Sequence, residues 1–375
     1  MSSEINAITM PKWGLTMTEG KVVGWLKTQG QSFAEGEELL EIETTKITNV
    51  VEAEAGGILR RIVAPAGATL PVGALLAVIA PEGAADSDID TFVSGFAIPE
   101  PAVEAAVAAE TASPRELEAA GLRLRYLEVG EGDSVPVLLL HGFGADLNTW
   151  MFTQPALADG RRVVALDLPG HGGSAKQLDR GDAESLAALV GHALDALGIE
   201  RVHLVGHSMG GGIAISFALR DPLRVATLTL IASASLGPEI NAAFIDGFVR
   251  AARRREAMEV LGLLVHDPAL VSRTMVEDVL RYKRLDGVAA ALTRIAEEWF
   301  PGGRQRVRLG DAVAALRLPA QIIWGREDRI IPVAHAEALA PRLPVHILEQ
   351  TGHLPHMERA GEVNRLIKRL IENQA

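Results

Sequence analysis

A serine between two glycines, at the junction of an expected strand and an expected helix, constrains the fold of this chain more than any other feature. Residues 206–210 have the sequence Gly-His-Ser-Met-Gly, after a short apolar run and before residues 213–219, whose apolar spacing is helical. Such a turn is strained and crowded, so it needs glycines at both ends, and it holds the serine hydroxyl clear of a sheet. The segment predicts a nucleophilic serine, Ser208, on an α/β fold.

Strand and helix patterns alternate around this turn. The helical pattern over residues 182–197 is followed by Gly198, which is a stop signal. Continuous apolar runs, expected as strands, cover residues 135–140, 162–167, 202–206, 225–231 and 321–325. Because strands that are apolar on both faces are typical of parallel sheets covered by helices, we expect a mostly parallel sheet with helices on both faces.

A catalytic acid and a catalytic base are expected after the serine, in that order, in a fold of this kind. Asp328 is the predicted acid because it lies in a turn after an apolar strand, and Glu327 is the local alternative. His353 is the predicted base because it directly follows a strand and a turn, whereas His356 is nearer the last expected helix and is interpreted as structural. His353 would take the proton of the Ser208 hydroxyl, and Asp328 would hold the imidazole in the required tautomer.

Acyl transfer also needs hydrogen-bond donors for the oxyanion that develops on the substrate. Backbone N–H groups serve this purpose, and one is expected from Met209, directly after the serine. The other is expected from Phe143, in the sequence His-Gly-Phe-Gly that follows the first long core strand. His141, which opens that loop, is interpreted as a brace for the turn rather than as a base.

These motifs, together with Asp-Leu-Pro-Gly-His-Gly-Gly-Ser at residues 167–174, resemble those of the α/β-hydrolase family from residue 122 to the end of the chain. The resemblance implies a helical cap over the site, at about residues 238–311. The cap segment contains a group of arginines, which would either meet phosphates of a nucleotide-containing acyl acceptor or form a solvated helical face: Arg253, Arg254, Arg255, Arg304, Arg306 and Arg308.

The first 82 residues have a different pattern, with short alternating segments separated by turn residues, which is typical of an all-β domain. Two glycines, a leucine and an isoleucine recur at an offset of 37 residues: Gly30, Gly36, Leu39 and Ile42 match Gly67, Gly73, Leu76 and Ile79. The repeat predicts two similar β-halves packed face to face.

A lysine lies between the two halves of this repeat. Lys46 follows Glu-Thr-Thr, with β-branched residues on both sides, and is expected at the tip of a hairpin. The arrangement resembles the biotinyl/lipoyl domain family over residues 4–80, in which the tip lysine is acylated. Biotinyl members usually flank the lysine with Met, whereas Thr45 and Ile47 flank it here, so the resemblance implies lipoate on Lys46.

The two patterns divide the chain into a lipoyl domain at residues 1–82, a linker at residues 83–113 and an α/β-hydrolase domain at residues 114–375. The expected linker is rich in Ala, Pro and acidic residues and poor in large apolar ones, although Phe92, Phe96 and Ile98 provide anchors for local docking. The linker would allow the small domain to extend away from the rest of the chain.

Charge and composition exclude several classes of protein. The chain has 36 basic and 48 acidic residues, a net charge of −12, which argues against binding to nucleic acid or to an anionic membrane. No apolar run approaches the roughly 18 residues that would span a bilayer, and residues 1–6 lack the features of a secretory signal, so we expect a cytoplasmic protein. Since Cys is absent, disulfides and a cysteine nucleophile are excluded, and we assign no metal site.

A lipoyl domain fused to an α/β-hydrolase domain resembles the acyltransferase component of acetoin-cleaving dehydrogenase systems. The resemblance implies transfer of an acetyl group from dihydrolipoyl-Lys46 to coenzyme A as co-substrate. It also implies two partners, a thiamine-diphosphate-dependent acetoin dehydrogenase and dihydrolipoamide dehydrogenase, and is compatible with a homo-oligomer. Two alternatives stay open: a serine hydrolase of esters, thioesters or C–C bonds tethered to a lipoyl domain, and a scaffold whose hydrolase-like domain only binds partners.

Overall fold

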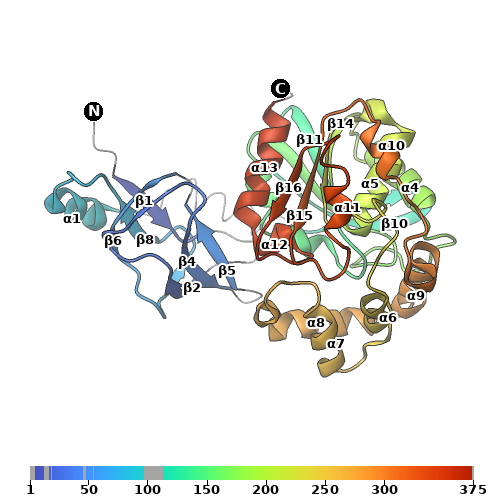
Figure 1. Cartoon of the computed structure of the whole chain (residues 1–375), viewed down its shortest axis with the longest axis horizontal. Helices are drawn as coiled ribbons and strands as arrows, with labels where there is room; N and C mark the ends of the chain where they lie inside the picture. The colour runs from blue at the N-terminus through green and yellow to red at the C-terminus, as the bar shows by residue number, and fades with distance from the viewer. Residues whose placement is uncertain are drawn as a thin grey trace. The chain divides into compact units, whose positions relative to one another are not determined.

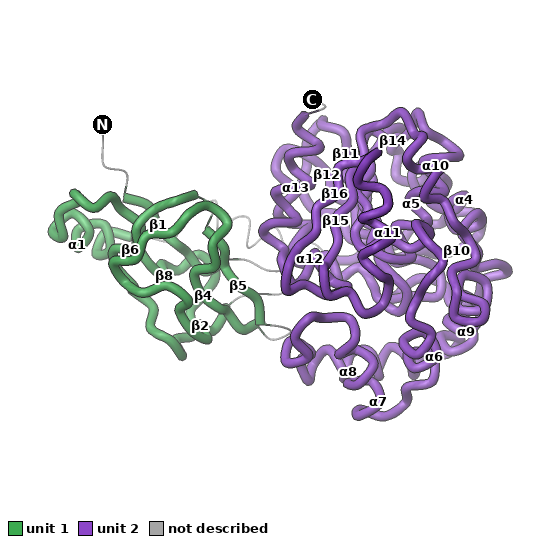
Figure 2. The backbone as a smooth tube through the Cα atoms, viewed as in Figure 1, with its two compact units in different colours: residues 1–112 green, residues 113–375 purple. Residues whose placement is uncertain are grey.

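The computed structural model describes residues 5–11, 17, 19–44, 48–53, 55–96 and 113–373. The chain divides into unit 1, residues 1–112, and unit 2, residues 113–375 (Figure 2). The division falls within the segment expected as a linker. Each unit has its own buried core.

Unit 1 consists of two four-stranded sheets, with strand orders β1-β8-β6-β3 and β5-β4-β2-β7. All pairs of neighbouring strands are antiparallel. The core between the sheets includes Val22, Leu40, Leu59 and Leu76, which are fully buried. The strands are β1 (Asn6–Thr9), β2 (Glu19–Trp25), β3 (Ser32–Phe33), β4 (Glu38–Glu43), β5 (Thr48–Glu52), β6 (Gly57–Ile62), β7 (Thr69–Pro71) and β8 (Leu75–Ile79).

The predicted internal repeat is present in the backbone of unit 1. Four turn glycines adopt positive φ at matched values 37 residues apart: Gly30 (89°) with Gly67 (87°), and Gly36 (82°) with Gly73 (81°). The backbone hydrogen bonds repeat as well, since Leu26 N donates to Leu39 O and Val63 N donates to Leu76 O, both at 2.9 Å. The two halves therefore use the same turns and the same pairing, which confirms the predicted two-fold β arrangement.

A helix extends unit 1 beyond residue 82, where the domain was expected to end. Helix α1 (Asp86–Gly95) packs against β8 through the fully buried Ile89, which contacts the cluster that contains Val78. An ion pair of 2.8 Å between Arg61 and Asp90 joins the helix to β6. The first part of the expected linker is thus folded onto unit 1 because it carries apolar residues at helical spacing.

Unit 2 is built on an eight-stranded sheet with the order β16-β15-β14-β13-β11-β12-β10-β9. Strand β10 is antiparallel to both of its neighbours, and the other neighbouring pairs are parallel, as predicted. The strands are β9 (Arg115–Ala119), β10 (Leu122–Val129), β11 (Ser134–Leu140), β12 (Arg161–Leu166), β13 (Val202–His207), β14 (Val225–Ile231), β15 (Ala320–Gly325) and β16 (Val345–Leu348).

Helices cover both faces of this sheet (Figure 1). Helices α4 (Ala183–Ala196) and α5 (Met209–Arg220) pack together on one face, and α3 (Gln154–Leu157) and α13 (Ala360–Glu372) pack together on the other. The Asp182 side chain caps α4 by accepting hydrogen bonds from Glu184 N and Ser185 N, which explains where this helix begins. In the described part of the chain, no helix is long and apolar enough to cross a membrane.

Five α-helices lie between β14 and β15. The last is α10 (Gly310–Ala314), and the other four lie in the segment expected to form a cap. These four are α6 (Ala242–Arg250), α7 (Arg254–Leu261), α8 (Arg273–Lys283) and α9 (Val288–Trp299), and they lie together beyond one end of the sheet (Figure 1). Each has one apolar face, and α9 buries Leu292 and Ile295. The cap therefore has a small core of its own and presents its polar faces to solvent.

Candidate active site

Ser208 occupies a strained turn between β13 and α5. Its φ is 52° and its ψ is −119°, values that a residue with a side chain rarely adopts. A Cβ atom at Gly206 would lie 2.5 Å from Gly210 O, and one at Gly210 would lie 2.3 Å from Leu140 O, so both glycines are required by the crowded backbone. Ser208 N donates to Ile231 O at 3.0 Å, which ties the strained turn to the end of β14.

Asp328 and His353 form a buried hydrogen-bonded pair. The distance from His353 Nδ1 to Asp328 Oδ2 is 2.8 Å, and their side chains are 2% and 0% exposed. The second carboxylate oxygen of Asp328 accepts from Ile330 N at 2.8 Å and Ile331 N at 3.0 Å, which fixes the carboxylate in one orientation. Because Asp328 accepts the Nδ1 proton, the free lone pair of a neutral His353 is on Nε2, as a general base requires.

The two alternative residues have other contacts. Glu327 Oε2 accepts from Thr351 N at 2.9 Å, so this carboxylate holds the backbone before His353 rather than its ring. His356 is fully buried, and its Nε2 lies 2.9 Å from Thr149 Oγ1. Burial lowers the pKa of His356 to about 3, so it stays neutral and serves the packing of the unit.

His207 connects the serine turn to the histidine loop. Its Nε2 donates to His353 O at 2.8 Å, and the two rings pack with their centroids 4.9 Å apart. Burial holds the pKa of His207 well below its usual value, which leaves the ring neutral and able to make this bond. Since His207 directly precedes Ser208, the contact brings His353 to the serine turn. No hydrogen bond joins the Ser208 hydroxyl to His353 among the described residues, and such bonds often form only when substrate is present.

Glu358 supports the same loop and was not predicted from the sequence. Its Oε1 accepts from Gly352 N at 2.9 Å and from Leu354 N at 3.3 Å, the residues on either side of His353. Its Oε2 accepts from His266 N at 2.6 Å, on the cap. Burial raises the pKa of Glu358 above its usual value. A lone glutamate near the last helix carries no sequence signal for this role, because its partners are backbone N–H groups.

The loop after β11, which contains Phe143, lies against the serine turn that precedes Met209. A Cβ atom at Gly142 would lie 3.0 Å from Ser208 Cβ and 2.9 Å from His207 Nδ1, so this residue must be glycine. The backbone N–H groups of Phe143 and Met209 have no acceptor among the residues that the structure describes. Two free donors beside the serine are what an oxyanion hole requires.

The cap contributes aromatic side chains next to this loop. The Phe143 ring packs edge-on against Phe248 of α6, at 5.8 Å between centroids, and against Phe300 after α9, at 6.1 Å. Of the arginines singled out in the sequence, Arg255 is exposed and pairs with Glu259 on its own helix. For that residue the contacts favour a solvated face over a phosphate contact.

Lys46 lies outside the described residues, but the strands on either side of it are described. Strands β4 and β5 pair antiparallel, with Glu43 opposite Thr48, so residues 44–47 connect two paired strands. These flanks fit a lysine carried at the end of a hairpin, as covalent lipoate requires. In the described part of the chain, no group of three or more His, Asp or Glu side chains is arranged to hold a metal ion.

Comparison with known proteins identifies both units. A family model for the alpha/beta hydrolase fold matches residues 135–360, and a model described as biotin-requiring enzyme matches residues 6–79. A dihydrolipoyllysine-residue acetyltransferase component of the acetoin cleaving system of Pseudomonas putida is 47% identical over 97% of this chain and 97% of its own length. The chain belongs to this family of acetyltransferase components.

Other relatives agree with this assignment. The acetyltransferase component of the acetoin cleaving system of Cupriavidus necator is 44% identical over 98% of both chains. A solved meta-cleavage product hydrolase from Pseudomonas fluorescens has a TM-score of 0.63 and 27% identity, and the match covers 70% of this chain and 98% of that chain. The acetyltransferase components thus match nearly the whole chain, and the fold class predicted from the sequence is confirmed.

Proposed function

We propose that this chain transfers an acetyl group from dihydrolipoyl-lysine to coenzyme A in an acetoin-cleaving multienzyme system. The proposal is supported by relatives with this name that match both units at 47% and 44% identity. The observation that carries the chemistry is the buried 2.8 Å hydrogen bond between His353 and Asp328, on a loop tied to the strained Ser208 turn. That arrangement favours an enzyme over a scaffold that only binds partners.

The acyl donor would be held by unit 1. Lipoate joined to Lys46 by an amide bond would supply a dithiol that carries the acetyl group as a thioester. Residues 86–95 of the expected linker form helix α1, which packs on unit 1, so these residues would not let the small domain move away from its own helix. Lys46 itself would only hold the group, because an amide nitrogen takes no part in acyl transfer.

The chemical steps would take place in unit 2. His353 would accept the Ser208 proton at Nε2 as Ser208 Oγ attacks the thioester carbonyl, and the Phe143 and Met209 amides would donate to the oxyanion. His353 would then return the proton to the departing thiolate, which leaves an acetyl group on Ser208. In the second half of the reaction, His353 would take the proton of the coenzyme A thiol, and the thiol sulfur would attack the carbonyl of the acetyl-serine. The product would be acetyl-coenzyme A, with Ser208 protonated again by His353.

Water competes with coenzyme A for the acetyl-serine, so a transferase must exclude it. The aromatic contacts of Phe248 and Phe300 with Phe143 place apolar side chains of the cap beside the oxyanion donor. An apolar wall at this point would lower the local concentration of water while a long thiol enters. This gives the cap a role in the partition between transfer and hydrolysis.

The family also suggests the partner enzymes with which this chain would work. The chain would work with a thiamine-diphosphate-dependent acetoin dehydrogenase, which loads the arm, and with dihydrolipoamide dehydrogenase, which reoxidises it. We expect this system in the cytoplasm, and a homo-oligomer is compatible with the fold. Mixing the three components and measuring acetoin-dependent formation of acetyl-coenzyme A tests the partner assignment.

One experiment tests the central proposal. Intact mass spectrometry should show a lipoyl adduct on Lys46, and acetyl-coenzyme A and free acetate should be measured for the wild type and for Ser208→Ala. We expect the wild type to form mainly acetyl-coenzyme A and the variant to lose both products. Undiminished transfer by Ser208→Ala would refute the covalent mechanism. Predominant release of acetate at saturating coenzyme A would favour the hydrolase instead.

A further inference from the structure

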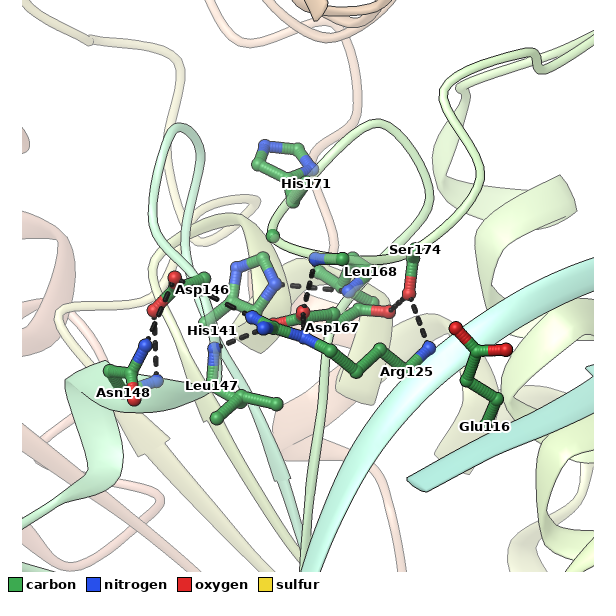
Figure 3. Close-up of polar contacts among 12 residues, drawn as sticks. Glu116, Arg125, His141, Asp146, Leu147, Asn148, Asp167, Leu168, His171 and Ser174 are labelled. Carbon is green, nitrogen blue, oxygen red and sulfur yellow. Dashed lines mark hydrogen bonds and ion pairs between the residues drawn. The ribbon is translucent and has the colours of Figure 1, made fainter. Parts of the chain in front are cut away.

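Asp167 is a fully buried carboxylate that the proposed reaction does not use. It follows β12 and opens the sequence Asp-Leu-Pro-Gly-His-Gly-Gly-Ser at residues 167–174. Its side chain accepts three hydrogen bonds (Figure 3): Leu147 N donates to Oδ1 at 2.7 Å, Gly173 N donates to Oδ2 at 2.6 Å, and the Arg125 guanidinium donates to Oδ2. The charge of Asp167 is therefore balanced by Arg125, and its oxygens are occupied by donors of the chain.

One of these bonds reaches the segment that carries an oxyanion donor. Leu147 closes the segment of residues 141–147, which contains Phe143. The segment is also held at its start, because His141 Nε2 accepts from Leu168 N at 3.0 Å (Figure 3). Two adjacent residues, Asp167 and Leu168, thus hold the segment at both ends.

The loop that carries Asp167 is itself held firmly. The Ser174 hydroxyl donates to Asp167 O at 2.6 Å and accepts from Arg125 N at 2.8 Å, which joins the two ends of the loop to β10. The loop wraps around the carboxylate so closely that a Cβ atom at Gly172 would lie 2.0 Å from Asp167 Oδ2. A fixed carboxylate can therefore impose its position on Leu147 N.

We propose that Asp167 is a positioning residue for the oxyanion donor: by holding Leu147 N, it fixes the segment that places the Phe143 N–H beside Ser208. The inference rests on the proposed serine mechanism. An oxyanion donor is effective only when it lies at hydrogen-bond distance from the charge that develops in the transition state. A segment released at one end would let that N–H move, and the loss would appear in the transition state and not in substrate binding.

Asp167→Asn is the sharpest variant, because it keeps the shape of the side chain. The amide oxygen can still accept from Gly173 N–H and Arg125, the two donors on Oδ2, but the amide NH₂ would then face Leu147 N–H, which is also a donor, so the hydrogen bond to Leu147 is lost. We expect kcat for hydrolysis of p-nitrophenyl acetate to fall by about 10- to 100-fold, less than for complete loss of an oxyanion donor. KM should stay unchanged.

The matched control is Gln154→Met. This variant removes two buried hydrogen bonds, from Gln154 Nε2 to Leu127 O at 2.8 Å and to Val163 O at 2.9 Å, but involves neither Asp167 nor residues 141–147. It should lower the melting temperature and leave kcat per active site unchanged, with active sites counted by titration with a fluorophosphonate. A merely structural role for Asp167 would give both variants the same behaviour.

A transition-state analogue provides the deciding measurement. A trifluoromethyl ketone adds to Ser208 and places an oxyanion at the position of the donors, so its inhibition constant should rise in Asp167→Asn by the same factor as kcat/KM falls. Unchanged inhibition, or a change in KM alone, would overturn the positioning role.

If Asp167→Asn does not fold, His141→Leu releases the other end of the segment and should show the same loss of transition-state binding; normal inhibition in that variant would count against the proposal. The outcome for the serine mechanism is read separately. If Ser208→Ala remained active in the same assay, the proposed serine mechanism would be refuted. If Ser208→Ala were inactive and Asp167→Asn had wild-type activity, only the positioning role of Asp167 would be refuted.

Discussion

In unit 1 the proposed acyl-carrying residue, Lys46, belongs to the short connection between two paired strands, whereas unit 2 collects its proposed catalytic residues from loops that follow β11, β13, β15 and β16. Ser208 and His353 are 145 positions apart and are connected through the contact of His207 with the carbonyl of His353. The carrier thus depends on local structure, and the catalytic site depends on contacts across the whole unit. We therefore expect the two functions to be separable by mutation.

The same difference appears in how each unit tolerates change. The strands on either side of Lys46 are held by the pairing of β4 with β5 and of β4 with β2. The site in unit 2 needs buried carboxylates, such as Asp328 and Glu358, that hold backbone N–H groups from several loops. Removing one partner from such a buried network leaves the others unsatisfied, which costs more than losing an exposed contact.

The largest expected effect separates the two units completely. Lys46→Arg keeps the charge and the hairpin but cannot be lipoylated, so acetoin-dependent formation of acetyl-coenzyme A should fall to background. Unit 2 should keep its activity on added S-acetyldihydrolipoamide, because its site is intact. The measurement is a pair of assays on one preparation of the full chain. Loss of activity on the added donor would show that the units are not separable.

The second prediction concerns the choice between the two neighbouring acids. Asp328→Asn should lower kcat about 10³- to 10⁴-fold, because the amide no longer supports the required tautomer and the charged form of His353. Glu327→Gln should lower it by no more than about threefold, since the amide oxygen can still accept the Thr351 N–H. Equal losses in both variants would contradict the assignment of Asp328 as the acid.

Much of the fold of unit 2 follows from continuous apolar runs. Strand β14 has the predicted bounds, and β11, β12, β13 and β15 lie within one residue of prediction at each end. The β9–β10 hairpin was not predicted as a pair of strands. Apolar residues of this hairpin alternate with charged ones. Two of the charged residues, Glu116 and Arg123, form an ion pair on the exposed side. An edge hairpin with one polar face provides less of the apolar signal that defines a buried strand.

The predicted site residues and the supporting ones differ in how visible they are in the sequence. Ser208, Asp328 and His353 lie in short motifs whose glycines and strand ends mark the position of the side chain. Asp167 and Glu358 act through backbone donors from distant segments, Leu147 N and His266 N. Every residue except proline has the same backbone N–H group, so the sequence does not show which N–H a distant carboxylate will bind.

The third prediction is that acid unfolds unit 2 before unit 1. All ten histidines lie in unit 2, the first being His141. Burial lowers the pKa of His171 and of His356 to about 3, so these groups bind protons in the unfolded chain near pH 6.5 but not in the folded one. Above pH 6.5 these histidines are neutral in both states, and protonation costs the folded state nothing. As the pH falls from 6.5 towards 3, the unfolded chain alone binds the protons, so the free energy of unfolding decreases. Between pH 6.5 and pH 5 the decrease is about 2 kcal/mol per histidine.

Urea unfolding of the full chain at pH 7.5 and pH 5, followed for each unit by hydrogen-exchange mass spectrometry, measures this difference. Unit 2 should lose several kcal/mol and unit 1 much less. In His356→Phe, the slope of stability against pH should fall by about 1.4 kcal/mol per pH unit, because one proton no longer binds on unfolding. A slope equal to that of the wild type would show that His356 is not the group that titrates.

The smallest expected effect tests the repeat inside unit 1. Gly30 and Gly67 have φ values of 89° and 87°, and a Cβ atom at either would meet nothing within 4 Å. Alanine at either position should therefore destabilise unit 1 through backbone strain alone, by about 1–2 kcal/mol, and by the same amount at both. The measurement is the unfolding free energy of unit 1 in each variant.

Gly24 is the matched control, since a Cβ atom there is equally free of contacts but the residue lies in β2 without a positive φ. Gly24→Ala should be neutral or stabilise unit 1 by up to about 1 kcal/mol, because alanine loses less conformational freedom on folding. Unequal costs at Gly30 and Gly67 would mean that the two halves share geometry without sharing energetics. Equal costs would extend the comparison between the units, because the two halves of unit 1 would then share both the geometry and the energetic cost of this turn, which depends on local backbone conformation alone.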